Sequence, residues 1–231
     1  MKQILFNTEM SLATLEDRKT ATRRVIKFTG KDIYGAACLY GKWNESYDQQ
    51  NLPEELVEWY VKNIAKPKYR PGDILYVRET FCELPVNPDG SDSGKIAKTY
   101  YKADGDLRPD GWRDQKWRPS IHMPQEAARI FLRVTDVRVE RLQAISIDSC
   151  IKEGVNVAPS MRRTARNHFI GIWNSTVKVK DLAAYGWDAN PWVWVIKFER
   201  ISKEEAARAE KTQTGSRKKD GEPWVERFYF G

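Results

Sequence analysis

Hydrophobic residues follow strand-like patterns in four parts of the chain. Stretches rich in β-branched and aromatic residues predict strands at Ile4 to Phe6, Ile74 to Phe81 and Ala128 to Leu142. A fourth strand is expected just after Pro191, where the sequence reads WVWVIKFERI. The strands at 128–142 and after Pro191 have apolar residues on both sides, so we expect both of their faces to be covered.

A helical period, with apolar residues three and four positions apart, predicts helices between these strands. The first runs from about 9 to 17 with Thr8 as its N-cap, and the second begins near Pro53. The face of the second helix that we expect to be buried consists of Leu56, Val57, Tyr60, Val61 and Ile64.

Two further helices are predicted in the second half of the chain. The shorter one covers 145–153, with Ser146 as its cap and Gly154 as its end. The longer one presents an apolar face made of Met161, Ala165, Phe169, Ile172 and Trp173. With no visible repeat and little alternation of strand and helix, the order predicts an α+β fold around a small mixed or antiparallel sheet or barrel.

Three segments show no clear period. Residues 29–50 are rich in Gly, Tyr and Lys, and 83–123 contain most of the loop-forming residues, with one hairpin expected around 98–102. From Ser202 the chain reads as a short charged helix and a linker that ends in WVERFYFG.

Composition indicates a folded protein without a membrane span. Of 231 residues 41% are apolar, including 9 Trp, 10 Tyr and 8 Phe, which is enough for a hydrophobic core. No stretch approaches the roughly 18 consecutive apolar residues of a membrane span, and the N-terminus does not read as a signal peptide. We therefore expect a soluble, cytoplasmic protein with no membrane partner.

Cysteine and histidine are too few and too scattered for a metal site. The chain has 3 Cys without a CxxC pair and 2 His that are far apart. We therefore expect no metal and no cofactor. The net charge of +7 favours a nucleic-acid partner through neutralisation of phosphates, without proving one.

The densest polar cluster is RKTATRR, residues 18–24. Hydroxyl groups among several cations can hold a phosphate or a carboxylate. A lysine whose pKa is lowered by burial or by neighbouring cations can also take the proton of a threonine hydroxyl and so create a nucleophile. The alternative is a solvated basic turn at the end of the first helix.

Charged residues at three other places are candidates for a functional site. Each of them also has a simple structural interpretation. Arg78 and Glu79 lie in an apolar strand, either at the mouth of a pocket or on an exposed sheet edge. Glu153 ends a short helix, where a carboxylate is disfavoured as an anion and suits a proton donor, or is simply exposed. A basic helix face that could follow a phosphate backbone, or be solvated, consists of Arg162, Arg163 and Arg166.

Four segments in order give a family resemblance. They are RKTATRR, YRPGDILYVRETF, RVERLQAISIDSCIKEGV and NPWVWVIKFERI. Together they resemble the ASCH domain, a PUA-like β-barrel family, and especially its longer members in phages and prophages. The resemblance implies a barrel domain over 1–201 with flanking helices, insertions at about 29–67 and 83–124, and a charged tail over 202–231.

The family also implies a function. Its barrel pocket suits RNA or a nucleoside, and small bacterial members are amidohydrolases that cleave N4-acetylcytidine without a metal. Matched to this chain, Lys19 would accept a proton, Thr22 would attack the acyl carbon and Glu153 would protonate the leaving amine. Residues expected to contact the ligand are Arg18, Thr20, Arg24, Arg78 and Glu79.

One position departs from the family pattern, since Asp17 stands where the pattern prefers Gly, which should loosen the turn. The two insertions could also roof the pocket or abolish catalysis, because a fold does not fix a reaction. The competing hypotheses are a non-catalytic RNA-binding module, a metal-dependent ribonuclease and a purely structural phage protein.

Overall fold

A five-stranded mixed sheet forms the centre of the protein in the computed structural model, which describes residues 1–48, 52–85, 87, 91, 92, 94 and 98–216. In their order across the sheet the strands are β1 (Lys2–Leu5), β3 (Ile74–Arg78), β6 (Phe131–Arg141), β7 (Trp192–Ile201) and β2 (Ala21–Val25). β1 and β3 are parallel, and the other neighbours in this sheet are antiparallel. The predicted α+β class is confirmed.

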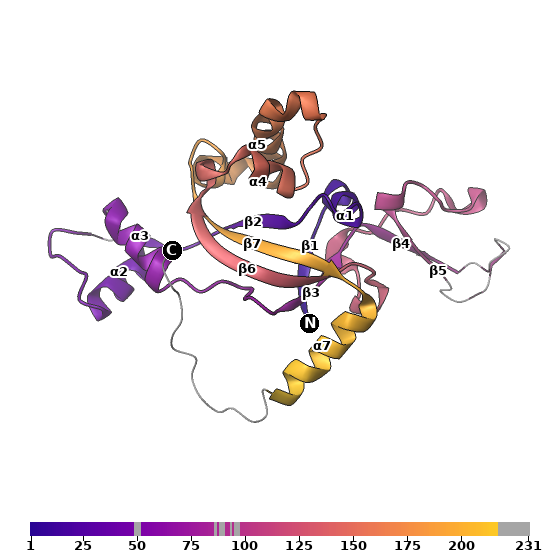
Figure 1. The fold of residues 1–231 in the computed structure, drawn as a ribbon, viewed down its shortest axis with the longest axis horizontal. Coiled ribbons are helices and arrows are strands. Elements are labelled where there is room, and N and C mark those ends of the chain that lie inside the picture. Colours follow the sequence, from indigo (N-terminus) through magenta and orange to yellow (C-terminus); the bar gives the residue numbers. More distant parts are fainter. Residues whose placement is uncertain (49–51, 86, 88–90, 93, 95–97, 217–231) are drawn as a thin grey trace.

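The sheet is strongly curled but open. β6 and β7 bend along their length (Figure 1), with an irregularity in β6 between Val134 and Asp136. The curl brings the two edge strands toward each other, so that the Arg24 side chain on β2 donates a hydrogen bond of 2.9 Å to the carbonyl of Leu5 on β1. Instead of the closed barrel we expected, the described residues leave a gap between β1 and β2.

Alternation along β7 places side chains in two cores. Ile196 and Phe198 face the interior of the curled sheet, with Ile4, Phe6 and Leu132. Val193 and Val195 face the other way and pack against the helices α4 (Ile147–Lys152) and α5 (Ala165–Thr176). These contacts confirm that β7 is covered on both faces.

The helices that flank the sheet begin close to their predicted caps. α1 (Thr8–Leu15) is capped by Asn7, whose side chain accepts a hydrogen bond from the backbone of Met10, and not by Thr8 as predicted. α4 is capped by Ser146, as predicted. It ends at Gly154, whose φ of +96° lies in the left-handed region that favours glycine.

The predicted helix face around α5 is only partly correct. Ala165, Phe169 and Trp173 are buried in the core, but Met161 is 54% exposed. The reason is that 159–164 form a 3-10 turn ahead of the helix, which shifts Met161 off the buried face. A short helix, α6 (Leu182–Tyr185), follows α5.

The segment expected as the first insertion contains two helices, α2 (Gly30–Leu39) and α3 (Glu54–Asn63). α3 buries Leu56 and Val61 from its predicted face. α2 lies in a stretch that we interpreted as having no period. It begins with a capping box between Thr29 and Asp32.

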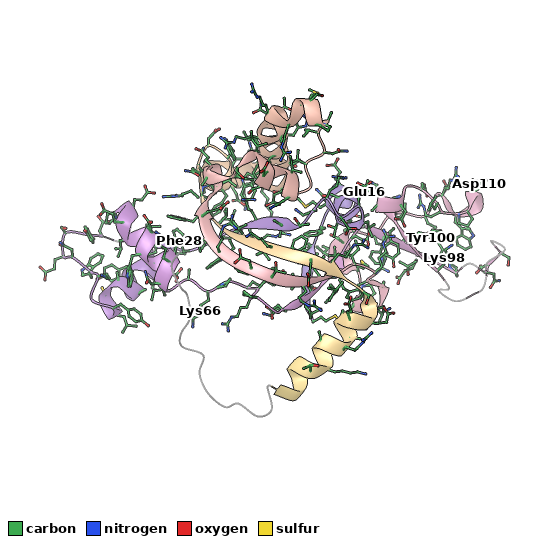
Figure 2. All side chains as sticks on the ribbon, viewed as in Figure 1. Glu16, Phe28, Lys66, Lys98, Tyr100 and Asp110 are labelled. Carbon is green, nitrogen blue, oxygen red and sulfur yellow. The ribbon has the colours of Figure 1, made fainter. Side chains whose placement is uncertain are left out.

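The predicted strand at 74–81 is two strands in different sheets. β3 ends at Arg78, and β4 (Phe81–Leu84) pairs with β5 (Lys98–Tyr101) in a hairpin. β5 supplies a strand where a hairpin was predicted around 98–102, but its partner strand lies earlier in the chain, at 81–84. Lys98 and Tyr100 lie on this hairpin (Figure 2), with the ammonium 5.0 Å from the ring centroid. The described segment 102–127 contains four short 3-10 turns and no α-helix or strand.

The charged segment after the sheet forms the helix α7 (Lys203–Ser216). Ala206 is fully buried against Ile74 of β3 and Phe131 of β6, so the start of the expected tail packs on the sheet. The final WVERFYFG lies outside the described residues.

Candidate functional site

The chain between α1 and β2 places Lys19 directly against Glu153. The backbone N–H groups of Arg18 and Lys19 both donate to the carbonyl of Ala13, which ends α1 in a tight turn. Lys19 then forms an isolated β-bridge with Glu153, the C-cap residue of α4. Two of the three predicted catalytic residues therefore touch.

Asp17 occupies a position in this turn that favours glycine. Its φ is +56°, in the left-handed region that is strained for most side chains but tolerated by Asp. Arg200 on β7 donates to both oxygens of the Asp17 carboxylate at 2.9 Å and lowers its pKa. The turn is thus held by an ion pair between Asp17 and Arg200.

The Lys19 ammonium is fully buried and has a partner for each of its three N–H bonds. It donates to the carbonyl of Ala21 at 2.9 Å, and to the carbonyl and the carboxylate of Glu153 at 2.8 Å each. It also lies 5.3 Å from the ring centroid of Phe6 in the interior of the sheet. Burial lowers the pKa of Lys19, and the Glu153 carboxylate opposes that shift.

Arg23 completes a buried network of ion pairs. Its guanidinium contacts the second carboxylate oxygen of Glu153 at 3.0 Å and the Glu140 carboxylate at 2.6 Å. Each carboxylate oxygen of Glu153 therefore contacts a cation, Lys19 at one and Arg23 at the other. The expectation that Glu153 is an exposed residue at the helix end is wrong, since it is 9% exposed.

Thr22 lies next to this network on β2. It is 2% exposed and pairs in register with Ile196 of β7. Thr22 and Glu153 line the same small cavity, of about 40 Å³, between β2 and α5. This volume is on the order of one water molecule, so the cavity itself does not hold a nucleoside.

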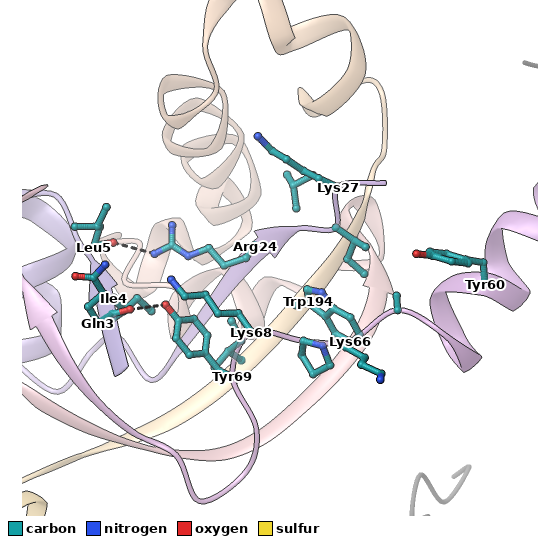
Figure 3. A pocket seen from close by; sticks show the side chains of 15 residues that line it. Gln3, Ile4, Leu5, Arg24, Lys27, Tyr60, Lys66, Lys68, Tyr69 and Trp194 are labelled. Carbon is teal, nitrogen blue, oxygen red and sulfur yellow. Dashed lines mark hydrogen bonds between the residues drawn. The ribbon is translucent and has the colours of Figure 1, made fainter. Parts of the chain in front are cut away.

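A much larger cavity lies in the gap between the edge strands β1 and β2. Its volume is about 520 Å³, and Arg24 lines both this cavity and the small one. Burial lowers the pKa of Arg24. Three rings contribute to the wall (Figure 3), from α3, from the segment before β3 and from β7: Tyr60, Tyr69 and Trp194.

Positive charge surrounds the same cavity. Its lining includes four cations, Arg24, Lys27, Lys66 and Lys68, and no Asp or Glu among the described residues. Within the described part of the chain none of these four forms an ion pair. By contrast, arginines such as Arg23, Arg108, Arg129 and Arg200 are each paired with a carboxylate.

The remaining residues of the predicted cluster lie at its edge. Arg18 donates to the carbonyl of Gly154 and pairs with Glu16. The Thr20 side chain is exposed, and its backbone N–H donates to the carbonyl of Lys152 at 2.9 Å. Neither lines either of these two cavities.

Arg78 and Glu79 also lie elsewhere. Arg78 donates to the side chain of Gln3 and to the carbonyl of Ile121. Glu79 is 1% exposed and receives two hydrogen bonds from Arg129, at 2.9 and 3.0 Å. Burial raises the pKa of Glu79, and Arg129 opposes that shift. The pair joins the end of β3 to the segment before β6 and does not line the two cavities.

The three arginines expected on one helix face are divided between two elements. Arg162 and Arg163 belong to the 3-10 turn, where Arg162 pairs with Asp148. Arg166 lies on α5 and donates to the carbonyl of Ile145 at 2.7 Å. The predicted continuous basic face is therefore not formed, because the helix begins only at Ala165.

Sequence reasoning missed most of the lining of the large cavity. The segment KPKYR alternates cations with an aromatic residue and supplies Lys66, Lys68 and Tyr69, but we interpreted only its end, as a turn. That alternation was the available signal. Trp194 was predicted only as part of a buried strand.

Neither a metal cluster nor a membrane helix is found in the part of the chain described. No group of three or more His, Cys, Asp or Glu side chains there is arranged to hold a metal ion. No helix among the same residues is long and apolar enough to cross a membrane.

Comparisons with known proteins give one structural neighbour. No protein-family model matches the chain, and no curated protein matches it. The crystal structure of protein EF3133 from Enterococcus faecalis V583, of the family DUF984, is similar with a TM-score of 0.37 and 10% sequence identity. That match covers 90% of this chain and 81% of the other.

Proposed function

We propose that the protein binds a nucleotide unit of RNA, or a modified nucleoside, in the cavity between β1 and β2. One observation carries this proposal: four cations without ion pairs and three aromatic rings line one space of about 520 Å³. Cations attract phosphates and aromatic rings stack on bases, so this lining is complementary to a nucleotide. The volume is within the range of small-molecule sites, about 300–1,000 Å³.

The unpaired charges favour an anionic ligand over a neutral one. Several buried or half-buried arginines elsewhere in the described chain are paired with carboxylates, among them Arg23, Arg108 and Arg129. Leaving four cations together without an acid costs electrostatic free energy in the free protein. A bound phosphate would remove that cost, which a neutral ligand could not do.

The test is binding of short single-stranded RNA, measured by fluorescence anisotropy at several salt concentrations. Replacing the exposed Lys68 by alanine should weaken binding several-fold and make the salt slope shallower by about 0.7, the value for one phosphate contact on a single strand. The control is Lys180→Ala, which removes an exposed lysine outside the cavity. It should leave the affinity and the salt slope unchanged. Absence of binding to RNA and to nucleosides at low salt would overturn the proposal.

A second candidate function, hydrolysis of an acylated base such as N4-acetylcytidine, is favoured by the contact between Lys19 and Glu153. Moving one proton across their 2.8 Å hydrogen bond converts the ion pair into a neutral amine and a neutral acid. Burial of Lys19 lowers its pKa and so favours the neutral amine. The amine would take the Thr22 proton, Thr22 would form an ester with the acyl group, and Glu153 would protonate the departing amine. Water would then release acetate.

This reaction also requires access, which Arg24 controls. The acyl group would have to reach the small cavity beside Thr22, and Arg24 lines both cavities. A ligand phosphate that draws Arg24 away from the carbonyl of Leu5 would open that path.

Acetate release from N4-acetylcytidine tests the second candidate. Thr22→Val keeps the side-chain shape and should lower the rate at least about a hundredfold, while leaving RNA binding unchanged. Thr20→Val, at an exposed threonine two residues away, is the matched control. If no acylated nucleoside is turned over, the hydrolytic function is excluded and the binding function stands by itself.

A further inference from the structure

A second cavity continues the first along the end of β2. Its volume is about 370 Å³, and Ile26 lines both. α3 also contributes to both walls, with Tyr60 in the first cavity and Val57 in the second. We infer that the two cavities are adjacent subsites for two consecutive nucleotides of a single strand, an inference that rests on the proposed function.

The second cavity is lined by flat rings rather than by free charge. Phe28, Tyr185 and Trp192 contribute to its wall. The Arg141 guanidinium lies 4.5 Å from the centroid of a Trp192 ring and forms an ion pair with Glu54. Because Arg141 already has a carboxylate partner, this wall is less positive than that of the first cavity. It suits the uncharged face of a base.

Lys27 lies at the junction of the two cavities. It is exposed and lines the first cavity, yet its ammonium is 5.5 Å from the ring centroid of Tyr185, which lines the second. Figure 3 shows its side chain extending away from Trp194. A cation between two ring-lined spaces is where the phosphate that links two nucleosides would lie.

Ligand length provides the test. For each of the four bases, we would measure the affinity of a labelled mononucleotide and of RNAs of two and four identical nucleotides. The corresponding DNAs would be measured in parallel. A dinucleotide should bind about tenfold more tightly than a mononucleotide with the same number of phosphates, because it adds one stacked base. Tyr185→Ala should remove this gain and leave mononucleotide affinity unchanged, since Tyr185 does not line the first cavity.

Two further variants separate stacking from a general loss of structure. Tyr185→Phe keeps the ring and should restore the gain. Tyr40→Ala removes a tyrosine that is 58% exposed and lines neither cavity, so it should change nothing. The backbone carbonyl of Tyr185 accepts the Trp173 indole N–H and is kept in every variant.

The possible outcomes distinguish the two proposals. Mononucleotide binding without any gain for the dinucleotide would overturn the second subsite and leave the proposed function intact. Absence of binding at every length would overturn the proposed function. A dinucleotide gain that survives Tyr185→Ala would place the second base elsewhere, and so contradict the inference.

Discussion

Lys19, Glu153, Arg23 and Glu140 form a continuous chain of buried or half-buried charges, and every link is an ion pair of 3.0 Å or less. Taking such groups out of water is costly, and the cost is offset only when each charge and each hydrogen-bond donor has a partner. This condition is met for Lys19, whose three donors are all used. Lys19 and Glu153, which the family resemblance matches to catalytic positions, therefore also take part in the ion pairs that join β2 to α4.

Removing the Lys19 charge should therefore destabilise the fold. Lys19→Met preserves most of the side-chain volume but leaves Glu153 with one cation, and we expect a loss of about 3–5 kcal/mol in the free energy of unfolding. The control, Lys152→Met, makes the same change at an exposed position nearby and should stay within about 0.5 kcal/mol. Urea unfolding measures the stability of both variants. Equal loss of stability in the two would show that the Lys19–Glu153 ion pair does not stabilise the fold.

Residue types were predictable here, but their partners were not. Lys19, Thr22 and Glu153 stood out in the sequence because cations, hydroxyls and a helix-end carboxylate are unusual in those positions. Arg23 could not be distinguished from Arg24, since the side on which each lies depends on the register of β2 against β7. That register is set by long-range packing, which no local pattern encodes.

Among the secondary-structure elements, those with a strong apolar period were predictable. β7 covers Trp192–Ile201, as its sequence predicted, because its alternate residues fill two separate cores. α2 was missed because it buries only Ile33 and Ala37, while its other large apolar residue, Leu39, is exposed. Its start was nevertheless encoded, by the Thr29 and Asp32 pair of a capping box.

The break after β3 shows a different limit of sequence reasoning. Residues 74–81 have continuous β-propensity, but the strand ends where Glu79 turns inward to meet Arg129. The partner is 50 residues away in the chain, so the buried pair could not be inferred locally. Once paired, Glu79 separates the central sheet from the β4–β5 hairpin.

For the molecule as a whole, the open edge of the sheet determines where the large cavity lies. β1 and β2 are connected by the Arg24 side chain and not by a backbone ladder, so the gap leaves room for the large cavity. The segment 54–69, with α3, borders this gap and supplies Tyr60, Lys66 and Tyr69. This segment, part of the expected first insertion, therefore forms part of the wall of the cavity.

α7 completes the molecule at the other end of the sheet (Figure 1). Its N-terminal half packs against β3 and β6 through Ala206, which is fully buried, while the adjacent Ala207 is exposed. The amino group of Met1 also forms an ion pair with Glu210 of α7. The helix is therefore part of the fold, and its two neighbouring alanines give a matched pair of test positions.

Enlarging the buried alanine should cost stability, and enlarging its neighbour should not. Ala206→Leu forces three extra carbon atoms between α7 and the sheet, and we expect it to lower the free energy of unfolding by about 1–3 kcal/mol. Ala207→Leu makes the identical change on the exposed side of the same helix, where helix propensity is nearly unchanged. Urea unfolding followed by circular dichroism compares them. Equal stability of the two variants would mean that α7 is not docked on the sheet in solution, and that the folded unit ends with β7.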